Sequence, residues 1–152
     1  MDLSRLRRGE LIAALGGLLL VAGVFLAWYK TAPDNPNATI DGARGSFSCW
    51  DVHHVLRWLL LAAAAAPLIL VWIVVRDHEL SWSRGDMTAV VGIAAFGLIF
   101  YTGVIARPGD PRGEISLQIG WFLALLGSLL MIGGAAMRSA RTEKPRKPPG
   151  VF

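Results

Sequence analysis

Residues 58–75 read WLLLAAAAAPLILVWIVV, a run without a single charged side chain. At ~1.5 Å per residue such a run extends about 27 Å as a helix, close to the ~30 Å hydrocarbon core of a bilayer. Lipid offers the backbone no water to bond, so the backbone must satisfy its own hydrogen bonds there. The run therefore predicts a membrane-spanning helix.

Three further uncharged runs have similar lengths. Residues 11–29, 87–106 and 115–137 contain 19, 20 and 23 residues. The first run is longer than the ~7–15 apolar residues of a cleaved signal peptide, so we expect it to be retained as an anchor. The chain is thus predicted to be an all-α membrane protein with four transmembrane helices in an up-down antiparallel bundle. The predicted spans are about 11–29, 55–75, 87–106 and 115–137.

Composition agrees with a membrane protein. Hydrophobic residues make up 54% of the 152 residues, and charged residues only 17%, against about 25% in soluble domains. The formal net charge is +4, but the basic residues gather at the chain ends rather than on one face. This pattern disfavours nucleic acid and favours contact of both tails with anionic lipid headgroups. The single cysteine, Cys49, rules out an internal disulfide and leaves an intermolecular one open.

The distribution of Lys and Arg predicts the orientation. Ten of these residues fall on the side of the two termini and five on the other side, which predicts that both termini are cytoplasmic. The predicted segments are a basic N-terminal tail at 1–10, a transmembrane domain at 11–137 with external loops 30–54 and 107–114 and a cytoplasmic loop 76–86, and a basic Pro-rich tail at 138–152.

Small residues recur every seven positions on two of the spans. One stripe lies on the first span and the other on the last; the residues are Gly9, Gly16, Gly23, Gly120, Ala124, Gly127 and Gly134. Such stripes let helix backbones approach closely. We favour packing inside the bundle, and the alternative is that one stripe faces a partner subunit.

Ionisable residues gather where the second span opens. Asp51, His53, His54 and Arg57 form a candidate external polar cluster, in which the spacing places Asp51, His54 and Arg57 on one helical face. The alternative is that Arg57 only extends its charge out to the interface. Further along this span, Pro67 removes one helical hydrogen bond and predicts a kink.

No residue pattern predicts a cofactor or catalysis. His54 and His78 lie 24 residues apart, about 36 Å along a helix, too far to share one haem iron. No cluster of three or four metal ligands occurs in the sequence, and phosphate loops, nucleophile elbows and zinc-protease signatures are missing. We expect no cofactor, no metal and no enzymatic activity.

Several short motifs, taken in order, resemble small uncharacterised four-span membrane proteins of actinobacterial type. They are Gly9-Glu10-Leu11-Ile12, Phe25-Leu26-Ala27-Trp28-Tyr29, Ser48-Cys49-Trp50-Asp51, Arg107-Pro108-Gly109 and the stretch from Ile115 to Ala124. Relatives tend to have Pro at position 27, Ala at position 49 and few histidines near position 51. The resemblance implies the fold and the compartment, which is the bacterial inner (plasma) membrane, and no activity.

These observations predict a non-enzymatic integral membrane protein that acts through helix–helix association. It would serve as an accessory, scaffold or assembly partner, with a second copy or another membrane protein as the partner. The alternative is a small-solute or ion pathway formed by an oligomer.

Overall fold

A computed structural model describes residues 6–76 and 85–142 of the chain. Most of the predicted loop 76–86 and parts of both predicted tails, with His78, lie outside the described residues. The elements are α1 (Arg8–Phe25), β1 (Ala27–Thr31), β2 (Ser46–Ser48), α2 (Cys49–Val52), α3 (Leu56–Val75), α4 (Asp86–Phe100), the π-helical turn η2 (Tyr101–Ile105), the 3₁₀ turn η3 (Arg112–Glu114), β3 (Ile115–Leu117) and α5 (Ile119–Thr142).

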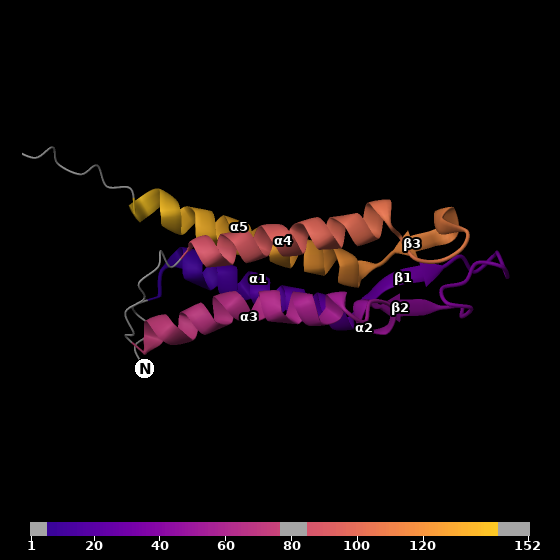
Figure 1. The fold of residues 1–152 in the computed structure, drawn as a ribbon, viewed down its shortest axis with the longest axis horizontal. Helices are drawn as coiled ribbons and strands as arrows, with labels where there is room; N and C mark the ends of the chain where they lie inside the picture. The colour runs from indigo at the N-terminus through magenta and orange to yellow at the C-terminus, as the bar shows by residue number, and fades with distance from the viewer. Residues whose placement is uncertain (1–5, 77–84, 143–152) are drawn as a thin grey trace, which may run out of the picture.

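The prediction of four apolar helices long enough to cross a membrane is confirmed. They are α1, α3, α4 continued through η2 to Ile105, and α5 from Ile119 to Ala140. Consecutive long helices run in opposite directions (Figure 1). The end of the bundle where α1 begins and α5 ends is called the terminal end below.

The prediction of an all-α chain is wrong, because the opposite end carries a small sheet. Its strand order is β2-β1-β3, and both outer strands pair antiparallel with β1. Tyr29 lies opposite Phe47 on one side and Leu117 on the other. Figure 1 shows these strands extending beyond the helices, at what is called the sheet end below.

The sheet shortens two of the predicted spans. The first helix ends at Phe25 instead of Tyr29, and the last begins at Ile119 instead of position 115. Trp28 and Tyr29 are fully buried in β1, and the Trp28 indole donates a 2.6 Å hydrogen bond to the carbonyl of Gly23. These two aromatic side chains are buried inside the protein at the sheet. The hydropathy of the sequence does not distinguish such burial from burial in lipid.

After Phe100, α4 widens into η2 where a tryptophan inserts. The Trp121 indole donates to the Ile99 carbonyl at 2.9 Å, and the Thr102 hydroxyl donates to the same carbonyl at 3.1 Å. Gly103 leaves the space that the indole ring fills, since a Cβ at this position would overlap Trp121. Side chains that compete for a helix carbonyl favour such a local π-helical turn.

Candidate functional site

The predicted polar cluster is divided by a break in the chain. α2 ends at Val52 and α3 begins at Leu56. The prediction that Asp51, His54 and Arg57 share one helical face is therefore wrong, because it assumed one continuous helix. Asp51 and His54 are exposed, whereas His53 is partly buried and points into the molecule, against Trp28 and Tyr29.

Asp51 takes part in capping the N-terminus of α2. Its carboxylate accepts hydrogen bonds from the backbone N–H of Ser48 at 2.9 Å and from the Ser48 hydroxyl at 2.7 Å. The Ser48 hydroxyl accepts in turn from the N–H of Asp51 at 3.3 Å, which completes a reciprocal N-cap. Because these bonds favour the ionised form, they lower the pKa of Asp51 below its ordinary value.

His53 joins three elements at the sheet end. The hydroxyl of Tyr29, in β1, lies 2.9 Å from Nε2 of His53 and donates to the carbonyl of Thr102, in η2, at 3.2 Å. A hydroxyl that donates to Thr102 accepts from His53, which places the imidazole proton on Nε2. Tyr29 is fully buried. This contact therefore connects the sheet to the start of α3 and the end of α4.

Burial disfavours charge on both of these side chains. Burial lowers the pKa of His53, and the neighbouring His54 lowers it further. Burial raises the pKa of Tyr29 above its ordinary value, despite its hydrogen bond to Thr102. Both groups are therefore neutral at neutral pH, and the pair is suited to holding the sheet in place.

The side chain of Arg57 packs beside two tryptophan rings. Its guanidinium donates to the Trp50 carbonyl at 2.9 Å and lies 4.5 Å from the Trp50 ring centroid and 5.7 Å from that of Trp58. Its Nε is buried without a hydrogen-bond partner. Trp50 also stacks on Phe25, at the end of α1. Arg57 thus secures α2 to α3.

Cys49 is buried at the first position of α2. None of its surface is exposed, and burial raises the pKa of its thiol to about 12. A thiol that stays protonated and covered is a poor nucleophile.

Both small-residue stripes lie in the same interface, between α1 and α5. A Cβ on Gly9 would lie 2.6 Å from the Gly134 carbonyl oxygen, and one on Gly23 would lie 2.7 Å from the Ala124 nitrogen. Gly16 faces Gly127 in the same way, and Gly120 faces the carbonyl of Leu26. These contacts are called the glycine seam below. The two stripes therefore pack against each other within one chain.

Pro67 is fully buried within α3, which continues from Leu56 to Val75. A Cβ on Gly17 would lie 3.0 Å from the Pro67 Cγ and 2.8 Å from the Ala64 carbonyl oxygen. Pro67 therefore contributes to the close packing of α3 against α1.

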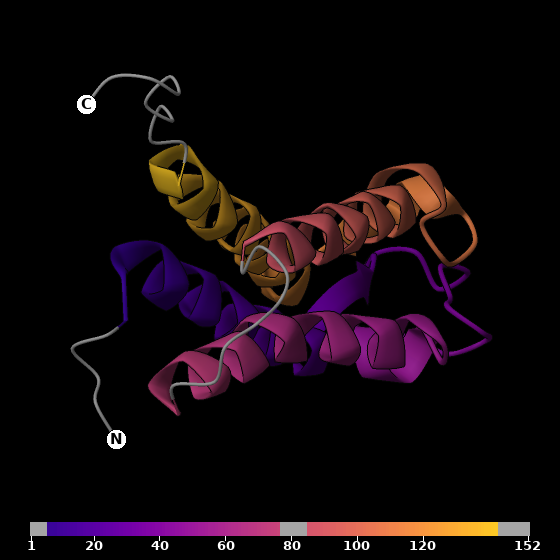
Figure 2. The same cartoon turned by 60° about the vertical axis from the view of Figure 1, so that its left-hand side comes forward.

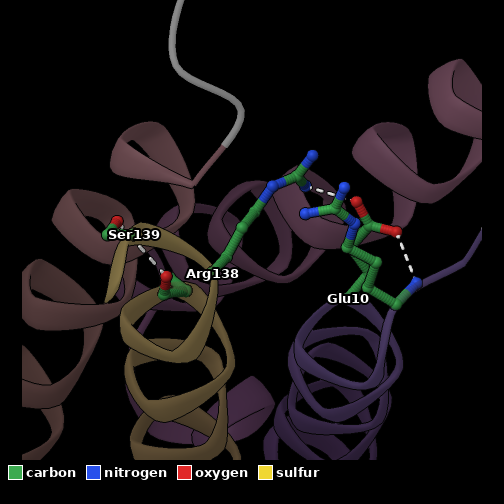
Figure 3. Close-up of polar contacts among 5 residues, drawn as sticks. Glu10, Arg138 and Ser139 are labelled. Carbon is green, nitrogen blue, oxygen red and sulfur yellow. Dashed lines mark hydrogen bonds and ion pairs between the residues drawn. The ribbon is translucent and has the colours of Figure 1, made fainter. Parts of the chain in front are cut away.

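A buried ion pair lies at the terminal end, where no site was predicted. Arg138 on α5 contacts Glu10 on α1 at 2.5 Å, and only 13% of the Arg138 side chain and 3% of Glu10 are exposed. Figure 3 shows the two side chains extending toward each other between the helices. Glu10 also accepts a hydrogen bond from the backbone N–H of Arg7 at 3.1 Å.

The sequence contains a signal for this pair. Glu10 follows Gly9, the first glycine of one stripe, and Arg138 lies one helical turn beyond Gly134, the last glycine of the other. Once the two stripes are paired antiparallel, these opposite charges become neighbours. Both residues were assigned to polar tails, so the pairing was missed.

An apolar groove lies between α3 and α4. In Figure 2 these two helices diverge toward the sheet end. The groove has a volume of about 290 Å³ and is lined by Leu59, Leu60, Ala62, Ala63, Val91, Ala94, Ala95 and Leu98. Leu59 and Leu98 are 51% and 39% exposed. Every lining side chain is aliphatic, so the groove is suited to an apolar occupant.

No protein family, curated protein or solved structure shows a significant match to this chain. The resemblance to four-span actinobacterial membrane proteins stays a prediction.

Proposed function

We propose that this chain is a non-enzymatic integral protein of the bacterial inner membrane that acts as an accessory or assembly partner of another membrane protein. Both termini would be cytoplasmic and the sheet end external. The chain would associate through its transmembrane helices, with anionic headgroups around its basic tails and no role for nucleic acid. The predicted resemblance to actinobacterial four-span proteins supports the same compartment.

The groove between α3 and α4 carries this proposal. Each of the four helices contains an eighteen-residue apolar segment. In this segment, 44% of the residues are buried inside the protein in α1 and also in α5, but only 28% in α3 and in α4. The glycine seam joins α1 to α5 and leaves no small-residue stripe of that pair for a partner. α3 and α4 therefore present the open face of the bundle.

We assign a transmembrane helix of another protein as the occupant of this groove. Alanines line it on both sides, with Ala62 and Ala63 on α3 and Ala94 and Ala95 on α4. Small residues allow a neighbouring helix backbone to approach closely, and this gives van der Waals contact that a mobile lipid chain does not. The groove offers an ion no polar ligand, so it favours association over the alternative of conduction.

The orientation is tested with reporter fusions. Fusions at Arg84 and at the C-terminus are expected to report the cytoplasm, and fusions after Asn37 and at Gly109 the external side. An external C-terminus would overturn the orientation.

The association is tested by photo-crosslinking in native membranes. A photoreactive residue at Ala94, which lines the groove, is expected to form an adduct with another integral membrane protein. Leu129 on α5 is 46% exposed and lies outside the groove, so it serves as the control position. Adding Ala62→Trp, which fills the groove from an exposed position, is expected to abolish the adduct at Ala94.

The mass of the adduct decides between the outcomes. An adduct of twice the 16.4 kDa chain would show self-association and overturn the accessory role. Lipid adducts alone, or equal protein adducts from Ala94 and Leu129, would overturn the groove as a helix-binding site.

A further inference from the structure

Three arginines border a crevice at the terminal end. The crevice lies between the start of α1 and the last turns of α5, and its lining residues are Arg7, Arg8, Gly9, Met137 and Arg138. Arg7 and Arg8 are exposed. This feature is called the arginine crevice below.

Among the residues that the structure describes, the acidic groups near the crevice leave it positively charged. Glu10 faces inward, is only 3% exposed and is paired with Arg138. Asp86 at the start of α4 is not among the lining residues, and its carboxylate accepts from the Ser139 hydroxyl at 3.5 Å. Arg7 and Arg8 line the crevice and are exposed.

The surroundings of the crevice combine positive charge with apolar surface. Met137 in its wall is 42% exposed, and Leu11, one helical turn into α1 from Arg8, is 52% exposed. Both belong to helices that are candidate membrane spans. A ligand at this place therefore meets guanidinium groups at one side and an apolar surface at the other, which matches a phospholipid at the depth of its headgroup.

We propose that Arg7 and Arg8, at the mouth of the arginine crevice, bind the phosphodiester group of an anionic phospholipid, since the crevice itself, at about 10 Å³, has no room for it. Arg7 and Arg8 donate to the phosphate oxygens, because guanidinium groups match the geometry of phosphate. Glu10 holds Arg138 in the wall of the crevice as a positioning residue. Basic pockets between membrane helices on the cytoplasmic side bind such headgroups. The inference deepens the proposed function, because it names a site for the anionic headgroups, and it rests on the four helices being membrane spans with cytoplasmic termini.

The test measures binding of the purified full chain to vesicles of phosphatidylcholine with and without phosphatidylglycerol. The variant Arg7→Gln/Arg8→Gln is compared with Arg44→Gln/Arg112→Gln, which removes the same charge from exposed positions at the sheet end. The charges of residues 1–5 and 143–152 are the same in both variants, so their contribution cancels.

Wild type and the sheet-end variant are expected to bind phosphatidylglycerol tightly. At roughly fivefold for each basic residue near an anionic surface, Arg7→Gln/Arg8→Gln should bind it about thirtyfold more weakly. Its affinity for pure phosphatidylcholine should stay unchanged. Equal losses in the two variants would overturn the site, since the preference would then follow net charge alone.

A second arm separates the lipid from a free anion. The shift in thermal unfolding temperature of the detergent-solubilised chain is measured with phosphatidylglycerol and with inorganic phosphate. Phosphatidylglycerol is expected to raise this temperature, and inorganic phosphate at the same concentration is not. An equal rise with inorganic phosphate would overturn the lipid assignment.

The lipid-binding proposal and the association proposal can each be overturned without the other. Loss of the Ala94 crosslink leaves the lipid preference untouched, and loss of the lipid preference leaves the crosslink in place. Release of the chain from native membranes by alkaline carbonate would overturn both.

Discussion

Gly16 and Gly127 each occupy the place that a side chain on the other would need. A Cβ on Gly16 would lie 2.5 Å from the Gly127 carbonyl oxygen, and a Cβ on Gly127 would lie 2.6 Å from the Gly16 carbonyl oxygen. The opposing atoms are backbone, so they cannot move aside as a flexible side chain does. The distance between α1 and α5 is therefore set by glycine.

Gly127→Leu is expected to destabilise the protein strongly. Overpacking typically costs about 1–3 kcal/mol, and we expect the upper part of this range because the opposing atoms are backbone. The control is Gly133→Leu on the same helix, because a Cβ there would meet nothing within 4 Å. Thermal unfolding in detergent checks both variants. Equal unfolding temperatures would show that the glycine seam does not determine stability.

Stability is expected to depend on pH through His53. Its pKa in the folded state is lowered by burial, so the folded chain binds this proton less readily than the unfolded chain. The free energy of unfolding should therefore be fully retained above the unfolded value of about 6.5 and fall as pH drops below it, until the folded pKa is reached. His53→Gln should flatten this decline. His54→Gln removes only the smaller cause of the shift, so it should flatten the decline less. Equal slopes in the two variants would contradict the assignment.

Cys49 is expected to be unreactive in the folded protein. Its thiol is fully buried with a pKa of about 12, so maleimide should label it only after denaturation. Oxidation of the folded protein should accordingly give no disulfide-linked dimer on a non-reducing gel. Rapid labelling under native conditions would show that the cover over α2 opens.

Glu10→Gln should remove a buried counter-charge of Arg138. Breaking a buried pair costs about 3–5 kcal/mol, and we expect the lower end here because 13% of the Arg138 side chain is exposed. A double-mutant cycle with Arg138→Gln measures the coupling. The double variant should lose less stability than the sum of the single variants. Strict additivity would mean that the pair contributes no energy of its own.

Arg57→Gln should loosen the connection between α2 and α3. It removes a hydrogen bond to the Trp50 carbonyl and the contact of a cation with the Trp50 ring. We expect a loss of about 1–2 kcal/mol and a change in tryptophan fluorescence. Arg112→Gln, at an exposed residue of η3, is the control and should change neither. Wild-type behaviour of Arg57→Gln would instead support a side chain that only extends to the interface.

The candidate sites were less predictable than the helices. A continuous helix from Ser48 onward would have grouped Asp51 with His54 and Arg57. The break at 53–55 directs His53 inward to Tyr29 and Arg57 to Trp50 instead. Each of these partners comes from another element, so spacing along one helix does not reveal it.

The positions of the four apolar helices follow from the sequence by itself. Long uncharged runs leave the backbone no alternative to its own hydrogen bonds in an apolar environment, and this holds whatever the neighbouring helices are. Glycines seven residues apart likewise identify surfaces of close approach before their partner is known.

Tertiary structure alone decided which surfaces meet. The sheet requires residues 27–31, 46–48 and 115–117 to come together across most of the chain, and short apolar stretches are equally compatible with strand and helix until that pairing forms. Likewise, only the antiparallel pairing of α1 with α5 brings Glu10 to Arg138. This pairing also buries both glycine stripes against each other. A surface buried against its own chain is no longer available to a partner, so the groove between α3 and α4 is the surface that stays open.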